Sequence, residues 1–152
     1  MSHDPEPHSP SPGGLEALVR AATAQYQDPE YAISMGYEPG PCVSGPNGGA
    51  MGVHFVKPAL LDDAQPKVDE PEALIYQPMR NGRFRLVGVE YIAFEGPAAL
   101  EGHLLHYAGS PNRYGLPPFY QLHVWAWKPN PNGTFADWNP DVSCDAFVAP
   151  PM

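Results

Sequence analysis

The chain has few basic residues and lacks a long apolar run. Its 152 residues include 8 lysines and arginines against 17 aspartates and glutamates, which gives a formal net charge of -9. Such a surface repels phosphate backbones and anionic lipid, so nucleic acids and membranes are not expected as partners. The longest apolar stretch, residues 86–94, is far shorter than the roughly 20 residues that span a bilayer. The sequence therefore predicts a small soluble protein with an acidic surface.

The N-terminal residues lack both the basic segment and the apolar segment of a secretory signal. Residues 1–14, MSHDPEPHSPSPGG, are rich in Pro, Ser, His and acids, a composition typical of a disordered leader. The chain as written is therefore predicted to be cytoplasmic, and an exported form from which a signal has been removed stays an alternative. We expect a single domain over residues 15–145 and a flexible tail over residues 146–152.

Cysteine is scarce, with one residue near each end of the expected domain. Cys42 and Cys144 are not part of a CxxC pair, which argues against a zinc knuckle and against a thioredoxin-type motif. A disulfide between them would close a loop of about 100 residues and stabilise the fold by roughly 4–5 kcal/mol. In a reducing compartment the same residues would be buried thiols. The sequence leaves both states open.

Apolar spacing predicts two helices at the N-terminal end of the domain. Residues 15–26 have helical periodicity. Asp28-Pro29-Glu30 then supplies an N-cap, a proline at the first helical position and an early acid for a second, shorter helix that Gly36 ends. Because glycine and proline recur between residues 39 and 49, this stretch is predicted to be a loop.

Four β-prone segments predict the sheet, over residues 51–57, 73–77, 84–94 and 119–128. Asn81-Gly82, between the second and third segments, favours the positive φ angles of a tight hairpin turn. With helices first and strands after them, the predicted fold class is α+β, with N-terminal helices packed on a curved antiparallel β-sheet. The pattern leaves open whether that sheet is a half-open barrel or a cone.

A further helix is predicted over residues 97–107, because Leu100, Leu104 and Tyr107 recur at helical spacing. His103 and His106 would then lie on one side of this helix. Exposed histidines are commoner in such a position than metal ligands.

Three polar residues occupy the middle of otherwise apolar strands. Glu90 lies where an ionised carboxylate must pair, bind a cation or keep its proton. His54 is central in MGVHFVK, and His123 lies between aromatic residues in FYQLHVWAWK. If these strands are neighbours, two imidazoles and a carboxylate meet on one concave surface. This set can bind a divalent metal such as zinc, iron or copper, with open positions for water or substrate.

The sequence supports three functions. The first is a metalloprotein or enzyme in which His54 and His123 are neutral ligands, and Glu90 is an anionic ligand or a catalytic base. Its pocket would be walled by Trp125, Trp127 and Tyr91. The second is a metal-free module that holds a small-molecule ligand with the same residues. The third is a structural or assembly protein whose aromatic residues form core. The oligomeric state is left open.

Several segments carry a resemblance to a known family. They are AATAQYQDPEYAISMGYEPGPCVSGPN, GGAMGVHFVKPALLD, LVGVEY and LHVWAWKPNPNGTFADWNPDVSC, which cover most of the chain after the leader. In these segments the chain resembles a family of small uncharacterised bacterial proteins. The resemblance implies a shared fold and a shared site. No activity is established for the family, so neither a reaction nor a catalytic residue is carried over.

Overall fold

The computed structural model describes residues 12–45, 49–61, 66–110, 112 and 114–148. Most of the predicted leader and the last residues of the predicted tail lie outside this part of the chain. The first helix already begins at Pro12, before the predicted domain boundary. At the other end Phe147, in the predicted tail, is partly buried and packs against the core.

Two helices and a 3-10 turn form the N-terminal part of the fold. Helix α1 (Pro12–Thr23) runs into the 3-10 turn η1 (Ala24–Gln27), and helix α2 (Pro29–Ser34) follows. The side chain of Asp28 accepts a hydrogen bond at 3.0 Å from the backbone N–H two residues on, as expected of an N-cap. The chain leaves α2 through Gly36 at φ +100°. The two predicted helices are confirmed, the first with a 3-10 turn at its end. No helix in the described ranges is long and apolar enough to cross a membrane.

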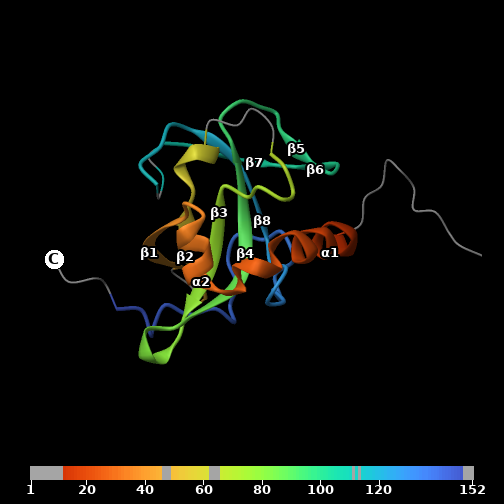
Figure 1. The fold of residues 1–152 in the computed structure, drawn as a ribbon. Coiled ribbons are helices and arrows are strands. Elements are labelled where there is room, and N and C mark those ends of the chain that lie inside the picture. The colour runs from red at the N-terminus through yellow and green to blue at the C-terminus, as the bar shows by residue number, and fades with distance from the viewer. Residues whose placement is uncertain (1–11, 46–48, 62–65, 111, 113, 149–152) are drawn as a thin grey trace, which may run out of the picture.

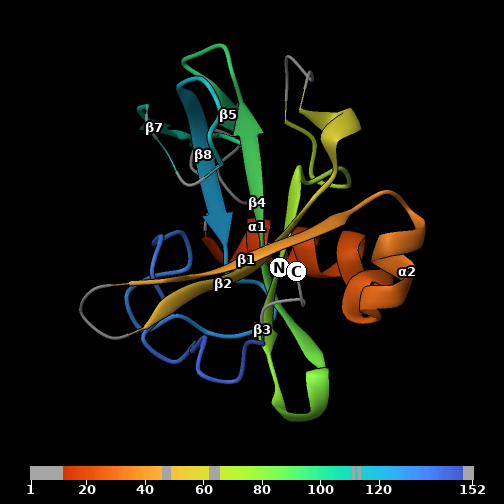
Figure 2. The same ribbon diagram turned by 90° about the vertical axis from the view of Figure 1, so that its left-hand side faces the viewer.

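Six antiparallel strands form one strongly curled sheet (Figures 1 and 2). In chain order they are β1 (Glu38–Ser44), β2 (Ala50–Val56), β3 (Ala73–Pro78), β4 (Phe84–Ala93), β7 (His106–Ala108) and β8 (Phe119–Val124). Their order across the sheet is β1-β2-β3-β4-β8-β7, and Figure 2 shows β1 and β2 crossing β3 and β4 at a steep angle. The predicted α+β class, with N-terminal helices on a curved antiparallel sheet, is confirmed, and the sheet is a half-barrel.

The remaining elements are short. Strands β5 (Ala99–Leu100) and β6 (His103–Leu104) form a separate antiparallel pair. The 3-10 turns η2 (Pro58–Leu60) and η3 (Arg80–Gly82) follow β2 and β3. The second of these contains the predicted hairpin turn, in which Asn81 has φ +67° and Gly82 has φ +73°. These paired positive angles match the twist of the strands that the turn joins.

A bulge in the β3–β4 pair changes which residues share a face. Strict alternation along β4 predicts Leu86 and Glu90 on one face and Val87 on the other. In the structure the register shifts between Ile75 and Tyr76. Leu86 therefore joins the core beneath the helices, and Val87 joins a cluster on the opposite face.

The loop predicted between residues 39 and 49 is wrong over its first half, which forms strand β1. Its prolines are tolerated because β1 lies at the edge of the sheet, where one side of the strand needs no partner. The pairing with β2 is also irregular, with register shifts between Pro39 and Cys42 and between Val43 and Ser44. The prolines that led to the prediction of a loop thus lie in an irregular edge strand.

The helix predicted over residues 97–107 is also wrong, because this stretch contains β5, β6 and the start of β7. Glu101 and Gly102 have φ +48° and +85°, angles that close a tight turn and interrupt a right-handed helix. His103 consequently packs against the ring of Phe135, 4.7 Å between ring centroids. His106 is exposed on the edge strand β7. Neither histidine belongs to the group of described residues whose ligand atoms lie close enough together to hold one ion.

Buried apolar side chains form two clusters, one on each face of the sheet. The larger one packs the sheet against the helices and includes Leu15, Val19, Tyr26, Phe55, Tyr76, Val89 and Leu122. The smaller one consists of Ala50, Ile75, Val87, Trp125 and Val142. Ile75 pairs directly with His54, and directly paired residues share a face. The face opposite the helices thus carries the polar residues that interrupt the apolar strands.

Candidate metal centre

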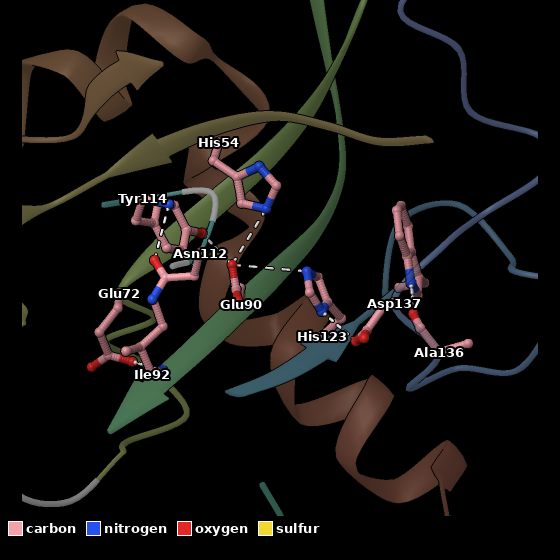
Figure 3. Close-up of polar contacts among 10 residues, drawn as sticks. His54, Glu72, Glu90, Ile92, Asn112, Tyr114, His123, Ala136 and Asp137 are labelled. Carbon is pink, nitrogen blue, oxygen red and sulfur yellow. Dashed lines mark hydrogen bonds and ion pairs between the residues drawn. The ribbon is translucent and has the colours of Figure 1, made fainter. Parts of the chain in front are cut away.

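Three buried polar side chains meet on the face of the sheet opposite the helices (Figure 3). His54 from β2, Glu90 from β4 and His123 from β8 are at most 2% exposed. The Nε2 atom of His54 lies 3.3 Å from Glu90 Oε1, and that of His123 lies 3.8 Å from the same oxygen. One possible ligand atom from each residue lies within 4.8 Å of the other two. The predicted meeting of these three residues is confirmed.

Strand pairing and sheet curvature together bring the residues close. Glu90 and His123 are direct partners in the β4–β8 ladder, whereas β3 separates His54 from Glu90. In a flat sheet β2 and β8 would lie roughly 14 Å apart, at about 4.8 Å per strand. The imidazole rings of His54 and His123 are nevertheless 6.0 Å apart between centroids. The sheet therefore curls toward this face.

Two glycines allow the strands to approach one another around the site. Gly52 has φ +101°, and a Cβ there would lie 2.8 Å from the carbonyl oxygen of Tyr76 in β3. A Cβ on Gly88 would lie 2.8 Å from the carbonyl oxygen of Val124 in β8. Only a residue without a side chain fits at these two points. The curvature that gathers the histidines thus depends on glycine in β2 and in β4.

Asp137 is a further member of the site, and strand periodicity did not indicate it. Its Oδ1 lies 3.0 Å from Nδ1 of His123, and this hydrogen bond lowers the pKa of the Asp137 carboxyl. An ionised carboxylate only accepts hydrogen bonds, so His123 donates through Nδ1. In the neutral imidazole the lone pair is then on Nε2, the atom that faces Glu90. Asp137 therefore fixes the orientation of the His123 ring, with Nε2 directed toward the cluster.

Tyr114 is the second site residue that strand periodicity missed. Its hydroxyl donates a short hydrogen bond to Oε1 of Glu90, the same oxygen that both histidines approach. Its ring stands edge-on to His54, with 5.6 Å between centroids. Tyr114 comes from the connection between β7 and β8, and Figure 3 shows it on the same side of Glu90 as His54. The side chains of His54, Tyr114 and His123 thus all approach the carboxylate of Glu90.

Glu72 is another fully buried carboxylate, but it lies outside this cluster. Its Oε1 accepts a hydrogen bond at 2.7 Å from the backbone N–H of Ile92, beyond the last pair that joins β3 to β4. Burial raises the pKa of Tyr37 and of Tyr91 far above the usual range of a phenol, and the charge of Glu72 raises both further. Both phenols therefore stay protonated and donate to backbone carbonyls. Glu72 thus joins the residue before β3 to the end of β4.

The aromatic wall predicted around the site is wrong for two of its three residues. Tyr91 lies in the core beneath the helices, on the opposite face from Glu90. Trp127 donates its indole N–H to Oγ1 of Thr23 in α1 at 3.0 Å. Of the three, Trp125 alone lies beside the cluster, stacked on His123 with 6.4 Å between ring centroids. Strand β8 ends before Trp125 and not at residue 128, so the alternation that placed Trp127 on the His123 face does not apply.

A small cavity of about 50 Å³ adjoins His54. Besides His54, it is lined by Gly40, Pro41, Val43, Val56 and Tyr114. Gly40, Val56 and Tyr114 also line a neighbouring groove of about 280 Å³. The cavity can hold a few water molecules or a ligand of a few atoms, because a cavity volume of about 10–15 Å³ is enough for one water molecule. Small residues of β1, and not tryptophans, therefore border the space next to the cluster.

The disulfide between Cys42 and Cys144 ties the C-terminal segment to the edge strand β1. Ala50 and Asn139 add a second tie, exchanging backbone hydrogen bonds at 3.1 and 3.0 Å. Figure 2 shows this segment, in blue, beside the ends of β1 and β2. Asp137 lies in the same segment, and the residue before it, Ala136, accepts a hydrogen bond at 2.6 Å from the indole N–H of Trp125. The backbone is therefore fixed on both sides of Asp137.

Comparisons of the chain with protein-family models, with curated proteins and with solved structures find no match. The resemblance to a family of small bacterial proteins therefore stays a prediction, and the geometry of the site is the basis on which a function can be inferred.

Proposed function

We propose that His54, Glu90 and His123 bind one transition-metal ion and leave coordination positions open for water or a small-molecule ligand. The observation that carries this proposal is the orientation of His123. Because Nδ1 donates to Asp137, the lone pair on Nε2 points at an oxygen of Glu90 only 3.8 Å away. Two electron-pair donors that face each other in a buried site repel unless a metal ion or a second proton lies between them.

The spacing of the donor atoms supports the same conclusion. Bonds of roughly 2.0–2.2 Å to zinc or a similar ion place tetrahedral ligand atoms about 3.3–3.6 Å apart. The two histidine nitrogens lie 3.3 and 3.8 Å from Glu90 Oε1. An ion could therefore be accommodated with small side-chain movements. Imidazole and carboxylate suit zinc, iron and copper, so the ligand set alone does not choose among them.

Open positions on such an ion would face the cavity beside His54. A bound water or a small ligand would be polarised there, since a divalent ion with three protein ligands lowers the pKa of its water. Glu90 would serve as an anionic ligand or as the base for that water. This arrangement supports a small metalloprotein that binds and polarises a water molecule or a small ligand. Catalysis would in addition require a substrate that reaches the ion.

Metal analysis of the purified protein tests this proposal. We expect one transition-metal ion per chain, or one equivalent of zinc taken up by protein that has been treated with a chelator. Mass spectrometry of the native protein gives the stoichiometry directly. Folded protein that takes up no zinc, iron or copper would contradict the proposal.

Asp137 is hydrogen-bonded to the proposed ligand His123, so its replacement should affect metal binding. Asp137→Asn is expected to weaken zinc binding by about 10- to 100-fold, because a carboxylate behind a ligating histidine fixes its orientation and raises its basicity. Asp141→Asn is the matched control, since it removes the same charge from an exposed position of the same segment. Competition titration with a chromophoric chelator measures both affinities. Equal affinities for the two variants would rule out this role for Asp137.

The second candidate is a metal-free small-molecule site. The hydrogen bond from Tyr114 to Glu90 favours it, because this bond satisfies the carboxylate without an ion. In that case His123 would carry a second proton and pair with both Glu90 and Asp137. The metal analysis distinguishes the two candidates.

The disulfide bears on where the protein works. Disulfides persist in oxidising compartments and are rare in reduced cytosol. The bond between Cys42 and Cys144 therefore supports an exported form over a cytoplasmic one. An open metal site with a small cavity is compatible with either compartment.

A further inference from the structure

We propose that Tyr114 is a fourth protein ligand of this centre, bound through its phenolate oxygen, and that the centre therefore prefers ferric iron to zinc. The inference rests on the proposed metal centre and adds a ligand and an ion to it. It concerns a residue that sequence periodicity did not indicate and that lies outside the cluster of two histidines and one glutamate.

The tyrosine oxygen and both histidine nitrogens converge on one atom. The hydroxyl of Tyr114 is hydrogen-bonded to Oε1 of Glu90, which is also the carboxylate oxygen that both histidine nitrogens approach. An ion that lies between Glu90 and the histidines is consequently within reach of the tyrosine oxygen. Moving that oxygen from Glu90 to the ion requires a small rotation of one side chain and leaves the strands in place.

The connection that carries Tyr114 is organised by Asn112. The side-chain oxygen of Asn112 accepts the backbone N–H groups of Tyr114 at 3.1 Å and of Leu116 at 3.2 Å. Its amide nitrogen donates to the carbonyl oxygen of Leu116 at 2.8 Å. Gly115 completes the turn at φ +67°. Since one side chain satisfies several backbone groups, the turn holds the tyrosine at a defined position.

Packing also directs the phenol inward. The ring of Tyr114 lies 5.6 Å from that of His54 and 5.7 Å from that of Phe119, between centroids. It borders both the small cavity and the neighbouring groove. An exposed tyrosine needs none of these contacts. Tyr114 is therefore close enough to the cluster to bind the ion, and it also lines the cavity next to the cluster.

The chemistry of the fourth donor selects the ion. A free phenol has a pKa of about 10, so binding as phenolate at neutral pH requires a cation strong enough to displace the proton. Ferric iron carries three charges and favours anionic oxygen donors, and tyrosine oxygen is a known protein ligand of iron. On binding, the O–H bond of Tyr114 breaks, an iron–oxygen bond forms, and the proton passes to solvent. Iron stays ferric throughout.

The experiment compares two tyrosine variants. Chelator-treated protein receives ferric citrate, and the visible spectrum is recorded during the titration. Phenolate bound to ferric iron gives a broad visible absorption band, which we expect in the wild type and in Tyr107→Phe, whose phenol is exposed. Tyr114→Phe should lack the band and bind ferric iron about a hundredfold more weakly, because the site loses one of its four protein ligands and an anionic one. Its zinc affinity should change less than about tenfold.

The outcomes separate this inference from the function on which it rests. Iron that binds to the wild type without a visible band, or a band that persists in Tyr114→Phe, overturns the role of Tyr114 and leaves the metal centre standing. A wild type that binds neither ferric iron nor zinc overturns both proposals. Retained zinc binding in Tyr114→Phe also shows that the variant is folded.

Discussion

Replacing His54 or His123 by alanine is expected to lower the zinc affinity of the protein by about two to three orders of magnitude. Each imidazole contributes one ligand, and one ligand of a zinc site is worth roughly 3 kcal/mol or more. Both rings are buried, so no exposed side chain takes their place. Titration of the chelator-treated protein with zinc against a competing chelator measures the loss.

His106→Ala is the matched control for this experiment. His106 is exposed on β7, which pairs with the strand that carries His123. Its removal should leave zinc affinity within about threefold of the wild type, since it lies outside the cluster whose ligand atoms meet at one point. If His106→Ala weakens binding as strongly as His54→Ala, the ion lies elsewhere. Unchanged affinity in all three variants would exclude the cluster as a metal centre.

Replacing both Cys42 and Cys144 by serine is expected to lower the free energy of unfolding by about 4–5 kcal/mol. The disulfide joins residues 102 positions apart, and in the chain-entropy model a cross-link of roughly this span removes that much conformational freedom from the unfolded chain. The loss is large beside the roughly 5–15 kcal/mol of a typical domain. Urea unfolding followed by tryptophan fluorescence compares the variant with the oxidised wild type.

Reduction of the wild type with dithiothreitol provides an independent comparison. It removes the same covalent bond without changing any residue, so it should give nearly the same decrease in unfolding free energy. A decrease below about 1 kcal/mol in both experiments would mean that the unfolded chain gains little freedom when the bond is lost. A large decrease in the serine variant alone would trace the effect to the substitutions.

Strand periodicity was enough to predict the centre of the site. His54, Glu90 and His123 are polar residues in the middle of apolar strands, and a polar group in such a position needs a partner. Antiparallel pairing then makes neighbours of strands that are distant in sequence. Periodicity did not give the curvature that brings β2 within reach of β8, because curvature depends on close backbone approaches at Gly52 and Gly88.

The site residues that periodicity missed lie outside regular strands. Asp137 and Tyr114 belong to connections, where no period relates a residue to a face of the sheet. Their positions follow from bonds that only the folded chain contains, the turn around Asn112 and the disulfide at Cys144. Local sequence carried no signal for either contact. Pairs of residues that vary together in related sequences are the signal that could have found them.

The incorrect predictions have a common physical origin. Leu104 and Tyr107 have helical spacing with Leu100, yet in the structure they are 67% and 64% exposed. Apolar spacing predicts a helix only when the apolar residues share a buried face. Likewise, alternation along 119–128 placed Trp127 beside His123, although regular pairing stops at Val124. In both cases the prediction continued a helical or strand pattern past the residue at which the chain changes direction.

The prolines of β1 have a consequence for how this protein meets other chains. An edge strand presents unpaired backbone groups to which a strand of another molecule can add. Pro39 and Pro41 have no N–H to donate to such a strand, and the register shifts beside them make the edge irregular. The same stretch covers the cavity next to His54. The strand that borders the site is therefore also one to which the strand of another chain would pair poorly.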